Sequence, residues 1–150
     1  MLVPKIVSWL ESSAGRVGTP RFFRYAGLAT TIGGADISHR GGLPGFVLVS
    51  GDTLSIPDFR GNRYFNTLGN FLGEPRASLL FPDFASGDLL QLQGLARIDW
   101  SRSAAQSVKG AERLWHFEVT RAWYRPAATT LRGSFVDYSP VTLATGTWDR

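Results

Sequence analysis

The sequence predicts a mostly β fold, in which about seven short antiparallel strands and one internal helix form a closed or half-closed barrel. Three observations lead to this prediction. Apolar and polar residues alternate over residues 89–99 and 114–124, as expected of half-buried strands. Turn signals separate several shorter apolar runs. Within the interior of the chain, helical spacing of apolar residues is clearest over residues 65–73.

Two hairpins are expected in the N-terminal half of the chain. The pair Gly33-Gly34 is a turn signal for the first, and residues 50–52 form a tight turn in the second. The glycines and proline of residues 41–44 break the chain between them. Residues 1–20 are expected to be an N-terminal extension that contains a short amphipathic helix. The strands expected here are residues 27–31, 35–39, 46–49 and 53–56.

The C-terminal half is expected to contribute longer strands and a polar segment, residues 101–112, with a short helix. The apolar run Leu79-Leu80-Phe81 predicts burial on both faces of its strand. The tail, residues 137–150, has little pattern, and the whole chain, residues 1–150, is expected to be a single domain. The strands expected here are residues 76–81, 89–99, 114–124 and 133–136. In the strand at 114–124, alternation places Trp115, Phe117, Val119 and Trp123 on one face and His116, Glu118 and Thr120 on the other.

Composition narrows the possible functions. The chain has 150 residues, no cysteine and a net charge of +4, to which lysine contributes only at Lys5 and Lys109. No apolar run is long enough for a membrane span, and the N-terminus is too polar for a signal peptide, so we expect a cytoplasmic protein with no membrane partner. Two distant histidines predict no metal site, and the absence of a Gly-x-Ser-x-Gly turn disfavours a serine hydrolase.

Residues 56–75 carry the most informative pattern, a strand end followed by a turn and a helix. The turn and first helical turn bring together Arg60, Asn62, Arg63 and Asn66. A helix start offers free N–H groups and a positive dipole end, so these side chains are suited to gripping a phosphate. A solvated helix face, with Asp58 as the helix cap, is the alternative that the residues alone leave open. Apolar residues Phe65, Leu68 and Leu72 are expected to face the core, and Gly73 and Pro75 to end the helix.

Three segments together carry a resemblance to a known family. Residues 38–47 read Ser-His-Arg-Gly-Gly-Leu-Pro-Gly-Phe-Val, and residues 57–63 read Pro-Asp-Phe-Arg-Gly-Asn-Arg, followed by Phe-Asn-Thr-Leu-Gly-Asn at 65–70. The third segment comprises residues 76–81 and 87–94. With these motifs, residues 26–124 resemble the FMN-binding split-barrel family related to pyridoxamine 5′-phosphate oxidase. Residues 135–140 resemble the same branch more weakly.

The resemblance implies a six- to seven-stranded antiparallel split β-barrel of the FMN-binding type, with short flanking helices and with FMN at a homodimer interface. By this resemblance, Asn62 and Arg63 hold the phosphate, and Arg60 and Asn66 compensate for the asparagine at a position where the oxidase has arginine. Arg40 lies near the phosphate or ribityl chain, the strand at 56–59 runs beside the flavin ring, and Gln91 approaches it. His39 is either a cofactor contact or an ordinary strand histidine. The candidate cofactor-binding residues are therefore His39, Arg40, Pro57, Asp58, Phe59, Arg60, Asn62, Arg63, Asn66 and Gln91.

The sequence departs from the oxidase at its C-terminus, where residues 141–150 lack the pyridoxal-phosphate-binding pattern. Pyridoxamine phosphate is therefore not the expected substrate. The expected function is that of an FMN-dependent oxidoreductase, with a small-molecule electron donor and acceptor and no assigned catalytic residue. The alternatives are a non-catalytic flavin or haem module and, less favoured, a basic nucleic-acid-binding barrel. Related branches bind haem or a deazaflavin, so these remain alternative cofactors.

Replacing Arg63 with alanine tests the expected phosphate contact. We expect Arg63→Ala to weaken FMN binding by about 1.5–3 kcal/mol, the range for a hydrogen bond to a charged group. Titration of the apoprotein with FMN measures this change. An unchanged affinity would count against the contact.

Overall fold

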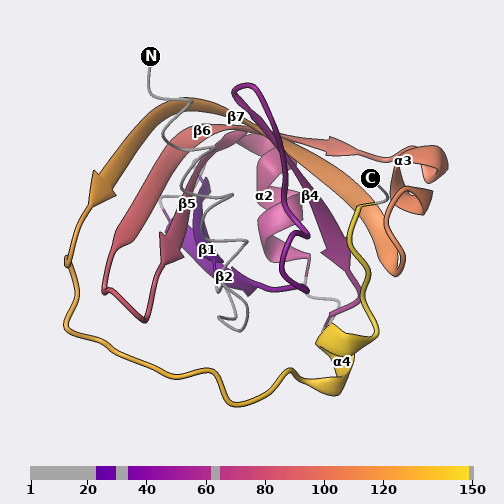
Figure 1. The fold of residues 1–150 in the computed structure, drawn as a ribbon. Coiled ribbons are helices and arrows are strands. Elements are labelled where there is room, and N and C mark those ends of the chain that lie inside the picture. Colours follow the sequence, from indigo (N-terminus) through magenta and orange to yellow (C-terminus); the bar gives the residue numbers. More distant parts are fainter. Residues whose placement is uncertain (1–22, 30–33, 62–64, 149–150) are drawn as a thin grey trace.

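The computed structural model describes residues 23–29, 34–61 and 65–148. One antiparallel sheet of seven strands dominates it, in the order β2-β1-β5-β6-β7-β4-β3. Figure 1 shows this sheet curling into a partial barrel with helix α2 (Asn66–Gly73) inside the curl. The strands are β1 Phe23–Ala29, β2 Gly34–Arg40, β3 Leu48–Ser50, β4 Thr53–Phe59, β5 Arg76–Pro82, β6 Leu89–Asp99 and β7 Ala111–Arg125. Two shorter helices follow later in the chain, α3 (Arg102–Gln106) and α4 (Pro140–Leu143).

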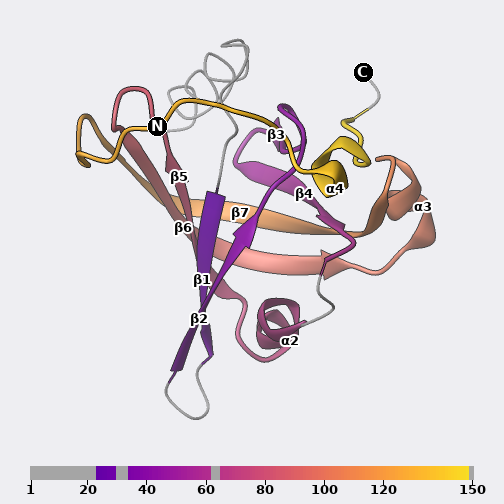
Figure 2. The same ribbon diagram turned by 90° about the horizontal axis from the view of Figure 1, so that it is seen from below.

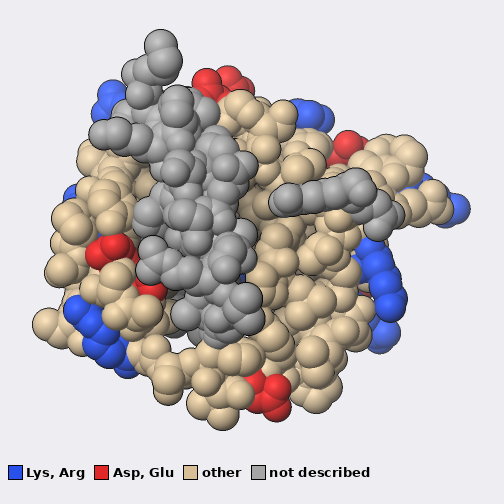
Figure 3. Space-filling view, in the orientation of Figure 1, with Lys and Arg blue, Asp and Glu red and all other residues tan. Residues whose placement is uncertain are grey.

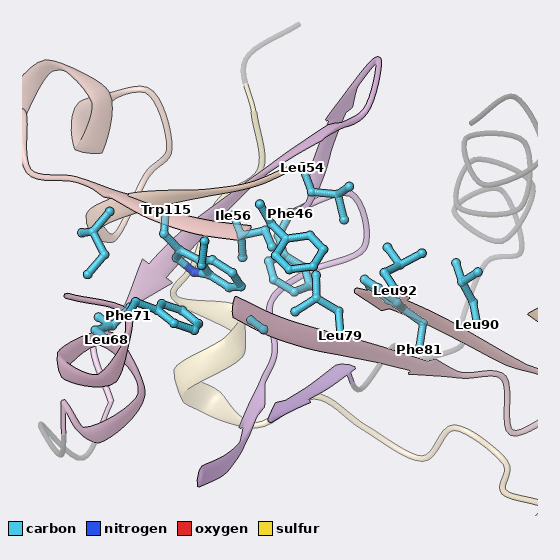
Figure 4. Close-up of a cluster of buried hydrophobic side chains, with 14 residues drawn as sticks. Phe46, Leu54, Ile56, Leu68, Phe71, Leu79, Phe81, Leu90, Leu92 and Trp115 are labelled. Carbon is cyan, nitrogen blue, oxygen red and sulfur yellow. The ribbon is translucent and has the colours of Figure 1, made fainter. Parts of the chain in front are cut away.

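The concave face of the sheet and α2 enclose the core. Along β6 the residues alternate strictly, with Leu90, Leu92, Ala96 and Ile98 buried. From β7, Trp115 and Phe117 are fully buried on the same face, and the Trp115 ring lies 5.5 Å from that of Phe71 on α2 (Figure 4). Helix α2 contacts β1, β2 and β6, and Figure 2 shows it beside the β1–β2 hairpin. The helix therefore fills the space at the end of the sheet where β2 is the edge strand.

Most of the predicted elements are confirmed. β1 and β2 pair as the predicted hairpin, although Gly34 belongs to β2 and the connection, residues 30–33, lies outside the described residues. β3 and β4 pair across the second turn, where Gly51 has a positive φ. β6 has the predicted bounds, and α3 lies within the predicted polar segment. The predicted N-terminal helix lies outside the described residues.

The predicted apolar face of the internal helix is wrong in part. The helix begins at Asn66, so its buried residues are Thr67, Leu68 and Phe71. Phe65, at the N-cap, is 46% exposed, and Leu72 is 69% exposed. Phe65 and Leu72 therefore belong to the surface.

Two strand predictions also need correction. Leu80 is only half-buried, so β5 has one buried face and not two. Residues 133–136 form no strand, because residues 126–139 run irregularly over the turn between β5 and β6. Thr129 N donates to Gly87 O at 3.1 Å and Gly133 N to Phe84 O at 3.2 Å, so their hydrogen bonds go to a turn and not to a strand edge. Past α4, the Trp148 indole donates to the Phe46 carbonyl at 2.8 Å, which fastens the tail to its own barrel.

A β-bulge changes which residues of β7 face the core. Gly94 pairs with Val119, but Gln93 pairs with Arg121, so Thr120 is an extra residue on β7. Beyond this point Ala122 pairs with buried Leu92 and contacts the core, whereas Trp123 pairs with Gln91 on the outer face. The prediction that Trp123 shares a face with Trp115 is therefore wrong.

Gly94 tests the importance of the bulge, because a Cβ there would lie 1.9 Å from the carbonyl oxygen of Glu118. We expect Gly94→Ala to lower the free energy of unfolding by about 1–3 kcal/mol or more through overpacking. Gly69→Ala is the matched control, since its Cβ would meet no atom within 4 Å on α2. It should stabilise the protein by about 0.4–1 kcal/mol. Chemical denaturation measures both, and equal effects would contradict this account of the bulge.

Candidate functional site

A buried carboxylate lies at the end of β4. In this strand Leu54, Ile56 and Asp58 alternate toward the core, and Asp58 is only 3% exposed. Arg40 Nη1, from β2, donates to Asp58 Oδ1, and Arg113 Nη1, from the paired position on β7, lies 3.3 Å from Oδ2. One carboxylate thus binds two guanidinium groups from different parts of the sheet.

Burial and charge act on Asp58 in opposite directions. Burial raises the pKa of Asp58 above its ordinary value, while the Arg40 and Arg113 guanidinium groups act to lower it. Arg113 also approaches Glu112, with Nη2 3.2 Å from Oε2. Both arginine side chains keep some contact with solvent, at 20% exposure for Arg40 and 17% for Arg113. The cluster can therefore interact with an anion that arrives from outside.

The start of α2 lies next to this cluster. Phe65, its N-cap residue, makes no side-chain cap, and the first turn holds no acidic residue. Thr67 is buried and its Oγ1 lies 3.1 Å from Ser38 Oγ, which ties α2 to β2. Arg113 lies over the Phe65 ring, 4.9 Å from its centroid, so the helix start and the ion cluster are in contact. The alternative in which Asp58 caps this helix is wrong, since Asp58 lies in β4 and binds arginines instead.

The structure brings some of the predicted site residues together. Arg40 and Asp58 are in direct contact, and Arg60 and Asn66, both exposed, lie in the chain between the end of β4 and the first turn of α2. Asn62 and Arg63 lie outside the described residues. Phe59 belongs to the same strand end, with its ring 6.3 Å from that of Phe46.

Other predicted residues lie elsewhere on the sheet. His39 is exposed on the face of β2 opposite Arg40, because adjacent strand residues alternate. Gln91 is half-buried on the outer face, paired with Leu80 and Trp123. Pro57 is buried and pairs with Leu114, which points away from Trp115. His39 and Gln91 therefore do not join the cluster around Asp58.

The sequence reasoning missed Arg113, Ser38 and Thr67. Arg113 precedes Trp115 and Phe117 at the same two-residue spacing, so it continues their inward face. A charged residue in register with a buried apolar stripe needs a buried partner, and that was the available signal. The two hydroxyls carried no comparable signal.

A second polar cluster lies on the outer face of the sheet. His116 Nδ1 is 2.9 Å from Ser55 Oγ, and its Nε2 is 3.6 Å from Asp99 Oδ2. Hydrogen bonds from Ser101, chiefly its backbone N–H, lower the pKa of Asp99, and His116 adds to this effect. Because His116 and Arg113 lie on opposite faces of β7, this group is separate from the Asp58 cluster.

Comparisons with known proteins place the fold. No family model and no curated protein matches the sequence. One similar structure is a Clostridium acetobutylicum protein related to general stress protein 26 of B. subtilis and described as of the pyridoxinephosphate oxidase family. Its TM-score is 0.59 at 13% identity, over 85% of this chain and 90% of that one. The chain shares this split-barrel fold. HupZ of Group A Streptococcus has a TM-score of 0.58 at 11% identity, over 89% of this chain and 98% of its own.

A third neighbour, general stress protein 26 from Bacillus anthracis, has a TM-score of 0.51 at 12% identity, over 78% of this chain and 93% of its own. At such identities the likeness is one of fold. The predicted fold class, mostly β with an antiparallel split barrel and few short helices, is confirmed. In the described part of the chain no helix is long and apolar enough to cross a membrane.

The pH dependence of stability tests the balance at Asp58. Because its pKa is raised in the folded state, the folded protein keeps this proton to a higher pH than the unfolded chain does. The contribution of Asp58 to the free energy of unfolding should therefore fall as the pH rises from 3.8 through the folded pKa. Denaturation of wild type and Asp58→Asn measures this change. As the pH rises across this range, the free energy of unfolding of the wild type should fall relative to that of the variant. A trend in the opposite direction would mean that the two arginines outweigh burial.

Proposed function

We propose that this protein binds FMN at the start of α2 and acts as an FMN-dependent oxidoreductase on a small substrate. The observation that carries the proposal is the cluster in which Arg40 and Arg113 bind one buried carboxylate beside an uncapped helix start. Both guanidinium groups keep some contact with solvent, although Arg113 also approaches Glu112. The shared fold and the sequence motifs of residues 38–47 and 57–70 support the same assignment.

The donors around the helix start fit a phosphate monoester. Arg60 and Asn66 are exposed there, and the chain between them carries Asn62 and Arg63. Guanidinium and amide N–H groups, with the free N–H groups of a first helical turn, are the donors that a dianionic phosphate requires. The buried carboxylate of the cluster, Asp58, is bound by two arginines, and Glu112 approaches Arg113, so neither carboxylate opposes an anion with its full charge.

When bound, the flavin supplies the electron or hydride transfer. The protein's own residues are then needed to bind and orient the cofactor. Of the two histidines, His39 lies on the opposite face of β2 from Arg40, and His116 on the opposite face of β7 from Arg113. This arrangement supports a site without a histidine acid–base catalyst, and we assign no catalytic residue. Pyridoxamine phosphate oxidation is not proposed.

We further propose a homodimer with the cofactor at its interface. Large apolar side chains remain exposed on the single chain, among them Ile37 at 64% and Val136 at 90%. Such surface commonly marks a protein–protein contact. A cytoplasmic location stays a prediction.

The alternatives have less support. A non-catalytic flavin or haem module, or a deazaflavin protein, would use the same barrel with another ligand. For the nucleic-acid-binding alternative, a continuous basic surface would be expected. On the face shown in Figure 3, Lys and Arg form separate groups, with Asp and Glu among them.

The absorption spectrum of the purified protein is the decisive experiment. We expect a flavin band near about 450 nm, because the cofactor brings its own chromophore, and bleaching of this band by NAD(P)H. A flavin band that no reductant bleaches would favour a store, and a Soret band would indicate haem. Colourless protein that takes up no FMN and binds oligonucleotides in a salt-sensitive way would overturn the proposal. Light scattering at micromolar concentration tests the dimer, which a monomer would contradict.

A further inference from the structure

Two exposed aromatic rings surround the charged cluster. Trp100 is 62% exposed and Phe65 is 46% exposed, and both are among the largest apolar side chains on the surface. Arg113 lies over each ring, 4.9 Å from the Phe65 centroid and 5.7 Å from the Trp100 centroid. One guanidinium therefore contacts both rings through cation–π interactions, while much of each ring stays open to solvent.

Hydrogen bonds and ion pairs fix Arg113 and the backbone that carries the two rings. Arg113 is fixed by Asp58 on one side and by Glu112 on the other. Trp100 lies between β6 and α3, in a turn where Ser101 N donates to Asp99 Oδ1 at 2.9 Å. Phe65 is fixed by its position at the first turn of α2, where its carbonyl accepts from Gly69 N at 2.7 Å. Such preorganisation reduces the entropy lost when a ligand stacks on the rings.

The surrounding charge selects the kind of ligand. Arg40 and Arg113 are paired here with Asp58 and Glu112, and exposed Arg60 follows Asp58 by two residues in the chain. An apolar segment of another protein is the alternative ligand for two exposed rings, but such a segment would make no use of the cation in contact with both rings. A planar ring that carries phosphate uses both features, since it stacks on the aromatic faces and its charge meets the arginines.

We propose that Trp100 and Phe65 form a subsite for the adenine ring of an adenine nucleotide, next to the phosphate site. This inference rests on the proposed function for its location. The adenylate has two possible sources. One is the second half of FAD, whose flavin half would occupy the proposed cofactor site. The other is a nicotinamide adenine dinucleotide that donates electrons to bound FMN. Both present the same purine and phosphate chemistry to these residues.

The test titrates ADP by calorimetry into the wild-type chain, residues 1–150, and into its Trp100→Ala and Leu72→Ala variants. Leu72 is a matched control because it is an apolar side chain of similar exposure, 69%, at the other end of α2. We expect Trp100→Ala to weaken ADP binding about tenfold, as loss of one stacking partner does. Leu72→Ala should leave it unchanged, and Trp100→Tyr should restore most of it. Thermal unfolding checks that each variant is folded.

Two further titrations distinguish the sources. FAD and FMN are titrated into the apoprotein, and ADP into the FMN-loaded protein. If FAD is the source, Trp100→Ala weakens FAD about tenfold and FMN by less than about twofold. If the dinucleotide donor is the source, Trp100→Ala weakens ADP binding to the FMN-loaded protein. This variant then binds FAD and FMN with affinities equal to each other.

The inference is overturned if wild type binds no ADP and does not prefer FAD to FMN, or if Trp100→Ala changes none of these affinities. It is also overturned if the variant changes only the oligomeric state, since the rings would then serve a second copy of the chain. Failure of FMN to bind, together with ADP binding that depends on Trp100, would reject the proposed function and leave the nucleotide subsite standing.

Discussion

The carboxylate of Asp58 joins strands that the sheet itself does not join. β2 is the edge of the sheet at one end and β4 is next to the edge at the other, and no backbone ladder connects them. Asp58 bridges Arg40 on β2 to its own strand and to Arg113 on β7. The Ser38–Thr67 hydroxyl contact adds a second link from β2, to α2. These two links connect β2 with β4, β7 and α2 at the place where the curl of the sheet brings them together.

The same bridge places a contact between strands and the candidate binding site at one position in the fold. A carboxylate that binds two arginines fixes the position of both guanidinium groups. Its single negative charge does not neutralise both of their positive charges. Arg113 also lies over the rings of Phe65 and Trp100, so a buried carboxylate, its ion pairs and two exposed rings are in contact. A ligand there would meet a site that is already ordered.

Much of the fold could be predicted from the sequence, because strand alternation and turn residues are local signals. β6 and the two hairpins follow from them directly. The site could be predicted only in part. Arg40, Asp58, Arg60 and Asn66 lie in recognisable motifs, but Arg113 reaches Asp58 through the pairing of β4 with β7. His39 is the neighbour of Arg40 in the motif, but strand alternation turns it to the other face.

The extra residue at Thr120 shifts the parity of the C-terminal third of β7 relative to the first part. A designer who counts every second residue from Trp115 would alter Trp123 when intending to alter the interior. The interior position is Ala122, which pairs with buried Leu92. A larger side chain at position 122 would therefore require Leu92 to shift. Conversely, Arg121, Trp123 and Arg125 form one outward row, so chemical labels or cross-linkers attached to these three sites would report on a single surface.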